Sequence, residues 1–215
     1  MEEKSSSIRH SQRQPRQKQI DLTDAEILDR GLEAFAELSY SGASVRELAK
    51  RMAVSHNFIN DRFGSKANFW RAVMDNAIAQ PYGEMMAIFG SDVDDVEKFT
   101  SFVKVFYRLS TNRPYINRII SDESALDSDR LDYLYRNYTG PILAEIELLA
   151  QRLMRAGRIP EISMDVLYSA LTGPAIILSQ QQMGRRIRGI EDLSPTEWER
   201  TTDTLTDVII RGLLI

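Results

Sequence analysis

The sequence predicts an all-α protein, in which an N-terminal three-helix domain precedes a larger helical domain, with about nine helices in total. Apolar residues recur at helical spacing along almost the whole chain from residue 21, and no segment alternates as a β-strand would. Of the 215 residues, 43% are hydrophobic and 27% are charged, which is typical of a globular protein and not of a disordered chain.

Capping sequences predict where the helices begin. The segments 23–26, 44–47 and 194–197 are capping boxes, in which a Ser or Thr hydroxyl and a Glu carboxylate satisfy free backbone N–H groups reciprocally. Ser55 and Ser65 are expected to cap the third and fourth helices. We therefore expect a first helix after Thr23 and a fourth after Ser65, and further helices at about 45–52, 56–62, 94–110, 113–122, 128–156, 163–188 and 195–213.

Proline and glycine residues predict where helices end or bend. Pro81 and Gly83 are expected to mark the end of the fourth helix, and Gly157 with Pro160 separates the seventh helix from the eighth. The Thr-Gly-Pro triplets at 139–141 and 172–174 fall inside helical patterns, so we expect them to mark kinks.

The residue inventory excludes several kinds of chemistry. The chain has no cysteine, which excludes disulfides, thiol nucleophiles and cysteine metal sites. His10 lies in a polar tail, so His56 is the only histidine expected in the folded part. No paired carboxylates and no Gly-rich phosphate motif stand out. We therefore expect no catalytic residue, no metal site and no cofactor.

The hydropathy pattern gives no indication of a membrane protein. The polar N-terminus has no apolar run that could act as a signal peptide. The longest apolar stretches, such as 174–178, fall far short of the roughly 20 residues that span a bilayer. We therefore expect no membrane partner and a cytoplasmic location.

Two short helices near the N-terminus predict a DNA-binding motif. The segments 45–52 and 56–62 are joined by only residues 53–55, which is the spacing of a helix-turn-helix. In such a motif one helix crosses the phosphate backbone, and the second places its N-terminal side chains in the major groove. We assign residues 21–75 to this domain and residues 76–215 to a second, helical domain.

The charge distribution agrees with this division. Residues 76–215 hold 15 basic and 20 acidic residues, so the net charge of −4 does not speak against DNA binding by the N-terminal domain. Residues 21–75 hold seven basic and nine acidic residues, whereas residues 1–20 hold five and two. We expect residues 1–20 to be a flexible basic arm, which is either a solubilising tail or a segment that contacts phosphates.

The segment 34–70, AFAELSYSGASVRELAKRMAVSHNFINDRFGSKANFW, resembles the TetR family of bacterial transcriptional regulators. The positions that carry the family pattern, in its order and spacing, hold Phe35, Tyr40, Gly42, Ser44, Val45, Leu48, Ala49, Val54, Ser55, Phe63, Ser65 and Lys66. The resemblance implies a dimeric regulator that binds double-stranded DNA through the N-terminal domain and a small-molecule effector through the C-terminal one.

The resemblance also implies which residues contact DNA. Positions that face base edges or the nearby backbone in the family hold Arg46, His56, Asn57 and Asn60. Positions that contact phosphates hold Ser44, Arg62 and Lys66, and Ser55 belongs to the same DNA-binding set. Arginine suits guanine O6 and N7, and asparagine suits adenine N6 and N7, so these residue types fit the implied roles.

The segment departs from the family pattern in and after the turn. Ala53 stands where the family usually has Gly, and a positive φ there would cost about 1 kcal/mol for a residue with a Cβ. Asn57 and Phe58 replace a usual Gly-Thr, and Asn60 replaces a tyrosine that contacts DNA in the family. The assignment of individual side chains to individual bases is therefore left open.

Aromatic residues are concentrated in the first half of the C-terminal domain, where the resemblance implies an effector pocket. The candidate lining residues are Phe102, Phe106, Tyr107, Tyr115, Tyr133 and Tyr138. Such a lining fits an apolar or aromatic effector, although each residue is also a candidate for the ordinary helical core. Residues that could meet a polar or anionic group are Arg108, Asn112 and Arg113.

The last two helices, at about 163–213, are expected to form a homodimer interface. Their apolar stripes consist of Leu167, Ala170, Leu171, Pro174 and Leu178 on one helix, and of Trp198, Leu205, Val208, Ile209 and Leu213 on the other. Two-fold symmetry is also what a palindromic operator requires. The alternative is that these stripes face only their own core.

These observations together predict a ligand-responsive, dimeric DNA-binding transcriptional regulator, most simply a repressor. A helical-bundle interaction protein without DNA binding is one alternative. A helical enzyme is a second alternative, against which the sparse histidines and absent cysteines count.

Overall fold

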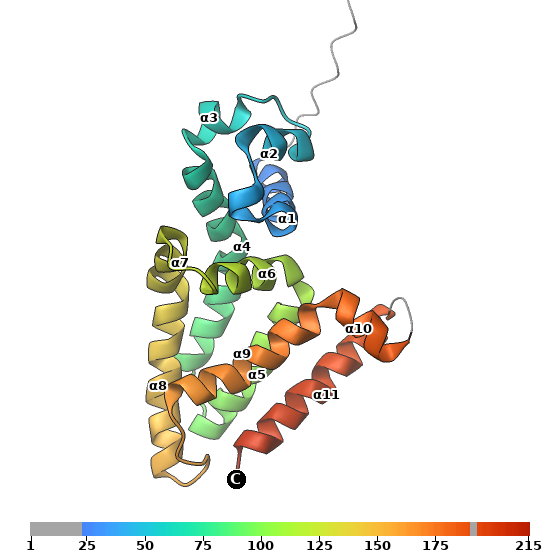
Figure 1. Cartoon of the computed structure of the whole chain (residues 1–215). Coiled ribbons are helices and arrows are strands. Elements are labelled where there is room, and N and C mark those ends of the chain that lie inside the picture. Colours follow the sequence, from blue (N-terminus) through green and yellow to red (C-terminus); the bar gives the residue numbers. More distant parts are fainter. Residues whose placement is uncertain (1–22, 190–192) are drawn as a thin grey trace, which may run out of the picture.

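The computed structural model describes residues 23–189 and 193–215, and within these ranges the protein is all-α, as predicted (Figure 1). The expected basic arm, residues 1–20, lies outside the described residues. The elements in chain order are α1 (Asp24–Gly42), α2 (Val45–Met52), α3 (Phe58–Phe63), α4 (Lys66–Phe89), α5 (Asp95–Asn112), α6 (Pro114–Ser124), α7 (Asp129–Leu134), a π-helical segment η1 (Tyr135–Thr139), α8 (Gly140–Arg155), α9 (Met164–Ser179), α10 (Gln181–Arg188) and α11 (Pro195–Leu213).

The first three helices and the start of α4 surround one aromatic core. Phe69 on α4 is fully buried, and its ring centroid lies 5.7 Å from that of Phe35 on α1 and 4.8 Å from that of Phe63 on α3. Gly31 allows α1 to approach α4 closely, because a Cβ there would lie 2.6 Å from Phe69 Cζ. The ring contacts therefore fix α1 and α3 on the same segment of α4.

Most of the predicted helix starts are confirmed. The capping boxes at 23–26 and 194–197 are both complete, and Ser65 accepts a hydrogen bond from the Asn68 backbone N–H. At 44–47 only one half forms, in which Ser44 accepts from the Glu47 N–H. The expected cap at Ser55 is wrong, because α3 begins later, at Phe58, without a side-chain cap.

The prediction that Pro81 ends the fourth helix is wrong, because α4 continues to Phe89. Proline lacks an N–H, so it leaves the carbonyl four residues earlier, that of Ala77, without its helical donor. Arg113 supplies the missing donor, with its Nη1 3.1 Å from the Ala77 oxygen. The continuous helix α4 therefore runs from the N-terminal domain along the second one and crosses the expected boundary at residue 75 (Figure 1).

Two of the expected long helices are each divided. The segment 128–156 forms α7, η1 and α8, and the segment 163–188 forms α9 and α10. Before Pro141, the Gly140 N–H donates to the Tyr135 carbonyl, five residues back, which is the π-helical pattern. A Cβ on Gly140 would lie 2.9 Å from that same oxygen. The predicted irregularity at 139–141 is therefore a π-helical segment.

The second domain is built from long helices that pack along one another. In Figure 1, α5, α8, α9 and α11 form its body, while α6 and α7 lie between this body and the first domain. The buried side chains of α5, α8 and α9 form one apolar core, against which α11 also packs. No helix in the described residues is long and apolar enough to cross a membrane.

Candidate DNA-binding surface and apolar cavity

The turn between α2 and α3 has the backbone geometry that a helix-turn-helix requires. Ala53 adopts φ 57° and ψ 39°, the left-handed conformation in which glycine is favoured. Its N–H still donates to the Ala49 and Lys50 carbonyls and closes α2. Ala53 therefore has a positive φ although it carries a Cβ.

The residues that the resemblance assigns to bases lie on the outer surface of the motif. Arg46 on α2 is exposed, and so are His56 and Asn57 before α3 and Asn60 on it, together with Ser55 in the turn. The opposite face of the motif is buried, because Ile59 and Leu48 are inaccessible to solvent. Phe58, which departs from the family pattern, packs on this inner side, with its ring 6.3 Å from that of Phe63.

The three residues expected to contact phosphates are partly engaged within the protein. Ser44 caps α2 as an acceptor, so its own hydroxyl proton is left for a phosphate. Arg62 forms an ion pair with Asp24 at the surface. Lys66 Nζ donates to the carbonyls of Tyr40 and Ala43 at 2.9 and 2.8 Å. Contact between these three residues and DNA stays a prediction.

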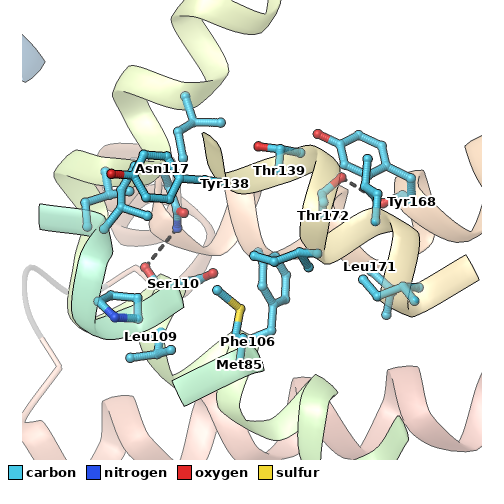
Figure 2. Close-up of a pocket in the computed structure, with 18 of the residues that line it drawn as sticks. Met85, Phe106, Leu109, Ser110, Asn117, Tyr138, Thr139, Tyr168, Leu171 and Thr172 are labelled. Atoms are coloured by element: carbon cyan, nitrogen blue, oxygen red, sulfur yellow. Dashed lines mark hydrogen bonds between the residues drawn. The ribbon is translucent and has the colours of Figure 1, made fainter. Parts of the chain in front are cut away.

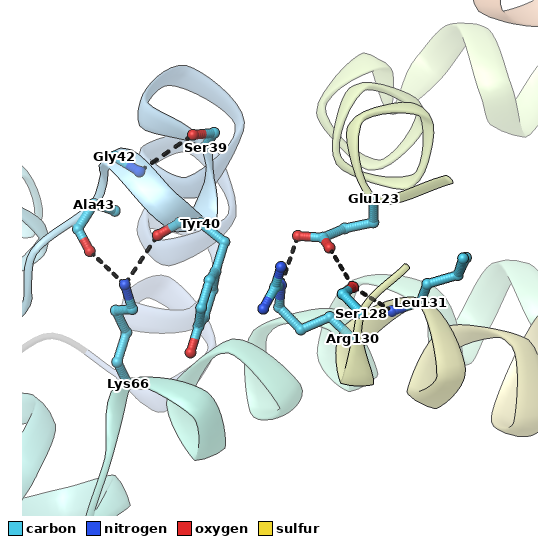
Figure 3. A network of polar contacts seen from close by, with 9 residues as sticks. All are labelled: Ser39, Tyr40, Gly42, Ala43, Lys66, Glu123, Ser128, Arg130 and Leu131. Carbon is cyan, nitrogen blue, oxygen red and sulfur yellow. Dashed lines mark hydrogen bonds and ion pairs between the residues drawn. The ribbon is translucent and has the colours of Figure 1, made fainter. Parts of the chain in front are cut away.

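A cationic cluster around Tyr40 joins the two domains (Figure 3). Lys66 Nζ lies 4.1 Å and the Arg130 guanidinium 4.0 Å from the centre of the Tyr40 ring. Arg130 also donates to the buried carboxylate of Glu123 at 2.7 Å, and Ser128 donates to the same group. Burial, and to a lesser degree Arg130, lower the pKa of Lys66. The end of α1 is thus tied to α6 and α7.

An apolar cavity of about 160 Å³ lies in the core of the second domain (Figure 2). The six helices from α4 to α9 and the segment η1 all contribute to its lining. Its apolar wall includes Ile78, Met85, Phe106, Ile142 and Leu171. The cavity has the character of a small-molecule pocket, which is mostly apolar with a few polar groups.

The aromatic residues proposed from the sequence are divided by the structure. Those that line the cavity are Phe102, Phe106 and Tyr138. The other three do not line it, and placing them there was wrong. Tyr107 is fully buried and donates to the Leu171 carbonyl, Tyr115 is 38% exposed, and Tyr133 packs against Trp70. Tyr133 faces the first domain, whereas the next residue, Leu134, lines the cavity.

The polar residues near the cavity also differ from those proposed. Arg108 pairs with Glu84 at the surface and Asn112 is exposed, so only Arg113 of the three contributes to the lining. Sequence reasoning missed Ser110 and Asn117, which line the cavity and are joined by a hydrogen bond from the Asn117 amide to the Ser110 backbone carbonyl (Figure 2). In the sequence, Asn117 could have been identified as a polar amide residue that lies among the apolar residues of α6.

Asp75 connects α4 to the cavity wall. Tyr138, whose ring lines the cavity, donates its hydroxyl to Asp75 Oδ1 at 2.6 Å. Tyr133 donates to both oxygens of the same carboxylate, at 2.7 and 2.9 Å. Burial raises the pKa of Tyr133 to about 12, and the hydrogen bond to Asp75 adds to this effect. Both tyrosines therefore stay protonated donors at neutral pH.

Part of the apolar stripes that were expected to form the dimer interface packs instead into the core of the second domain. Leu167 and Leu171 are buried inside the domain, as the alternative expectation had it. Val208 of the predicted stripe faces solvent, as do Val166 and Ile177, which the prediction did not include; the three are between 51 and 60% exposed. Dimerisation itself stays a prediction, but its candidate surface is this outer face.

The fold and the α2–α3 surface together define a helix-turn-helix DNA-binding protein with a second, helical domain. Residues 27–73 match the family model of the bacterial regulatory proteins of the tetR family. The N-terminal domain is thus that of the tetR family of bacterial regulatory proteins, which bind DNA and regulate transcription. None of the curated proteins compared with the chain matches it.

Solved structures with the same fold include several regulators. A Clostridium perfringens regulator assigned to fatty acid metabolism superposes with a TM-score of 0.69 at 20% identity, over 88% of this chain and 99% of that one. KstR2 of Mycobacterium tuberculosis, a ketosteroid transcriptional regulator, gives 0.65 at 13% identity, over 92% and 97%. FadR from Bacillus halodurans gives 0.61 at 14% identity, over 87% and 98%. At these identities the similarity establishes the fold.

Proposed function

We propose that the protein is a dimeric transcriptional repressor in the cytoplasm that binds a palindromic operator and is released by a small apolar molecule. The observation that carries this proposal is that one continuous helix, α4, begins next to the exposed α2–α3 surface and ends along an apolar cavity. A change in the cavity that displaces α4 therefore also displaces the DNA-binding surface.

The DNA-binding step rests on the exposed polar side chains of the motif. Arg46 and Asn60 lie on the outer side of α2 and α3, where they are free to meet base edges. The inner side is held by buried apolar contacts, which keeps the pair of helices rigid. Rigid presentation is what a fit to the major groove needs.

The dimerisation step rests on the outer face of the second domain. On α9, Val166, Ala170, Gly173 and Ile177 follow one another at helical spacing, and Val208 is exposed on α11. A Cβ on Gly173 would meet nothing within 4 Å, so a second helix has room to approach closely there. A two-fold dimer through this face would place the two helix-turn-helix domains on successive major grooves, roughly 34 Å apart.

The response to an effector rests on Asp75 and the two tyrosines that donate to it. An effector that moves Tyr138 changes a hydrogen bond to α4 directly. The shift between the two arrangements is limited by the difference in the effector's affinity for them. Names of the structural relatives refer to fatty acids and ketosteroids, and an apolar effector for this protein agrees with the apolar cavity.

The test of DNA binding is a selection of genomic fragments by the full-length protein, followed by affinity measurements on the selected site. The variants Arg46→Ala and Asn60→Ala should each weaken binding by about 1–3 kcal/mol. Arg155→Ala, an exposed arginine on α8, is the control and should leave affinity unchanged. If no fragment is selected, the protein is a helical interaction protein or a helical enzyme and the proposal fails.

The test of dimerisation is sedimentation equilibrium. The double variant Ile177→Glu with Val208→Glu places like charges on the outer face and should be monomeric at micromolar concentration. Leu148→Glu changes a side chain on α8 that is similarly exposed, at 53%, and should leave the dimer intact. A monomeric wild-type protein, or a double variant that dimerises normally, contradicts this interface.

A further inference from the structure

The charge and the size of the effector follow from the cavity, provided that the proposed function holds. We propose that the effector is a compact, uncharged molecule of about six to ten non-hydrogen atoms, with an apolar body and a single hydrogen-bond donor such as a hydroxyl. The donor is received at the end of the cavity formed by Asn117 and Ser110.

The absence of a free charge is the first argument. Among the described residues that line the cavity, Arg113 is the only charged one. Its Nη1 donates to the Ala77 carbonyl at 3.1 Å, and its Nη2 donates to Gln80 Oε1 at 2.9 Å. A charged ligand would therefore lose its hydration without gaining an opposite charge that is directed at it.

Arg113 is also not easily diverted to a ligand. Pro81 has no N–H, so the Ala77 carbonyl depends on Arg113 for its hydrogen bond. If the guanidinium turned to a carboxylate in the cavity, this carbonyl would be left without a donor inside the domain. The resulting penalty, on the order of 1–3 kcal/mol, opposes recognition of an anion.

The volume limits the size of the effector. The cavity of about 160 Å³ is close to the roughly 150 Å³ of an engineered apolar cavity that binds benzene in another protein. One ring with a short substituent fits this space without displacement of the lining. A long acyl chain or a fused four-ring skeleton does not fit.

The polar end determines which group the effector presents. Asn117 donates its Nδ2 hydrogen to the Ser110 carbonyl at 2.9 Å, which leaves the amide oxygen as an acceptor (Figure 2). Ser110, which also lines this end of the cavity, is only 6% exposed. An acceptor in a fixed position selects a ligand that donates a hydrogen bond.

The experiment compares four probes by calorimetry on the full-length protein without DNA. The probes are 4-ethylphenol, ethylbenzene, 4-ethylbenzoate and hexadecanol. We expect 4-ethylphenol to bind about tenfold more tightly than 4-ethylbenzoate, which keeps the same apolar body but adds a negative charge. Ethylbenzene should bind more weakly than the phenol, and hexadecanol should not bind. Tighter binding of the benzoate or of hexadecanol would overturn the proposal.

Two variants locate the binding site. Asn117→Leu should abolish the preference for 4-ethylphenol over ethylbenzene while ethylbenzene still binds, because the acceptor for the phenol hydroxyl is lost and the apolar wall is kept. The same change also removes the hydrogen bond to the Ser110 carbonyl. Ser110→Ala is a smaller change that should reduce the same preference, and it serves as the second variant if the first does not fold. Arg108→Gln, at the surface, is the control and should bind all four probes as the wild type does. An unchanged preference in both cavity variants contradicts the site.

Measurement without DNA separates this inference from the proposed function. If 4-ethylphenol binds as expected but no genomic fragment is selected, the inference about the ligand stands and the proposed regulator fails. If the selected DNA is released by 4-ethylbenzoate and not by 4-ethylphenol, the regulator stands and the inference fails.

Discussion

The two cores of the molecule differ in how completely they are filled. In the first domain, Phe35, Phe63 and Phe69 make ring contacts around fully buried aliphatic side chains. In the second domain, the helices enclose a cavity of about 160 Å³. An unfilled apolar cavity of this volume costs on the order of 4 kcal/mol.

The dense packing of the first domain favours rigidity, whereas the second domain retains space for a ligand. The DNA-binding domain must hold Arg46 and Asn60 in one fixed geometry, and its densely packed core achieves that. A cavity that stays open in spite of its cost is expected where a ligand restores the missing contacts. The two regions meet at α4, whose Asp75 lies at the junction.

The largest expected effect is a difference in stability loss between a substitution in the core of the first domain and one beside the cavity of the second domain. Phe69→Ala should reduce the free energy of unfolding by about 3–5 kcal/mol, because it opens a new cavity between α1, α3 and α4. Phe106→Ala should cost only about 1–2 kcal/mol, because the half-buried ring borders existing space. Urea denaturation measures both. Equal losses would mean that the two cores are equally well packed.

The second prediction concerns the junction between the regions. Asp75→Asn keeps the shape of the side chain but weakens two charge-assisted hydrogen bonds from Tyr133 and Tyr138. We expect a loss of about 2 kcal/mol in stability and a smaller effect of the ligand on DNA affinity. Asp132→Asn, which affects an exposed pair with Arg136, is the control and should cost less than about 0.5 kcal/mol. An unaltered ligand response would exclude Asp75 from the coupling.

The two regions also differ in how far the sequence predicts them. Helix α2 begins and ends as expected, at Val45 and Met52, because caps and turn residues act on their immediate neighbours. The cavity joins side chains from six helices and η1, and no local pattern in the sequence indicates which helix faces converge. Tyr133 and Tyr138 share an aromatic segment, but the π-helical turn sends only Tyr138 into the cavity.

Single residues show the same limit on prediction. Pro81 is a helix terminator by local rules, and only a distant arginine, Arg113, lets α4 continue past it. Lys66 stands at a helix N-terminus that faces DNA in the family, yet its ammonium group lies on the carbonyls that end α1. In both cases a contact between residues far apart in the sequence determines the local structure, and the spacing of residues along the chain does not predict that contact.

The third prediction concerns the turn at Ala53, which joins α2 and α3 in the first domain. Ala53→Gly should stabilise the protein by up to about 1 kcal/mol, because the left-handed φ of 57° carries a penalty for a Cβ. The greater freedom of glycine in the unfolded chain offsets part of this gain. Thermal unfolding measures the change, and Ala43→Gly, in extended backbone, is the control that should destabilise. Destabilisation by Ala53→Gly would mean that the turn is not strained.

The smallest expected effect is the pH dependence of the cap on α1. Hydrogen bonds from the Thr23 backbone N–H and hydroxyl hold the pKa of Glu26 below its ordinary value of 4.5. A carboxylate whose pKa is lowered by folding stabilises the folded state above its unfolded pKa, and this contribution is lost as the pH falls through the folded pKa. Thr23→Ala should therefore destabilise the protein at pH 7 and show a smaller deficit below about pH 4.5. Urea denaturation at both pH values measures the two deficits, and a deficit that is the same at both would mean that the Glu26 carboxylate contributes nothing to the cap.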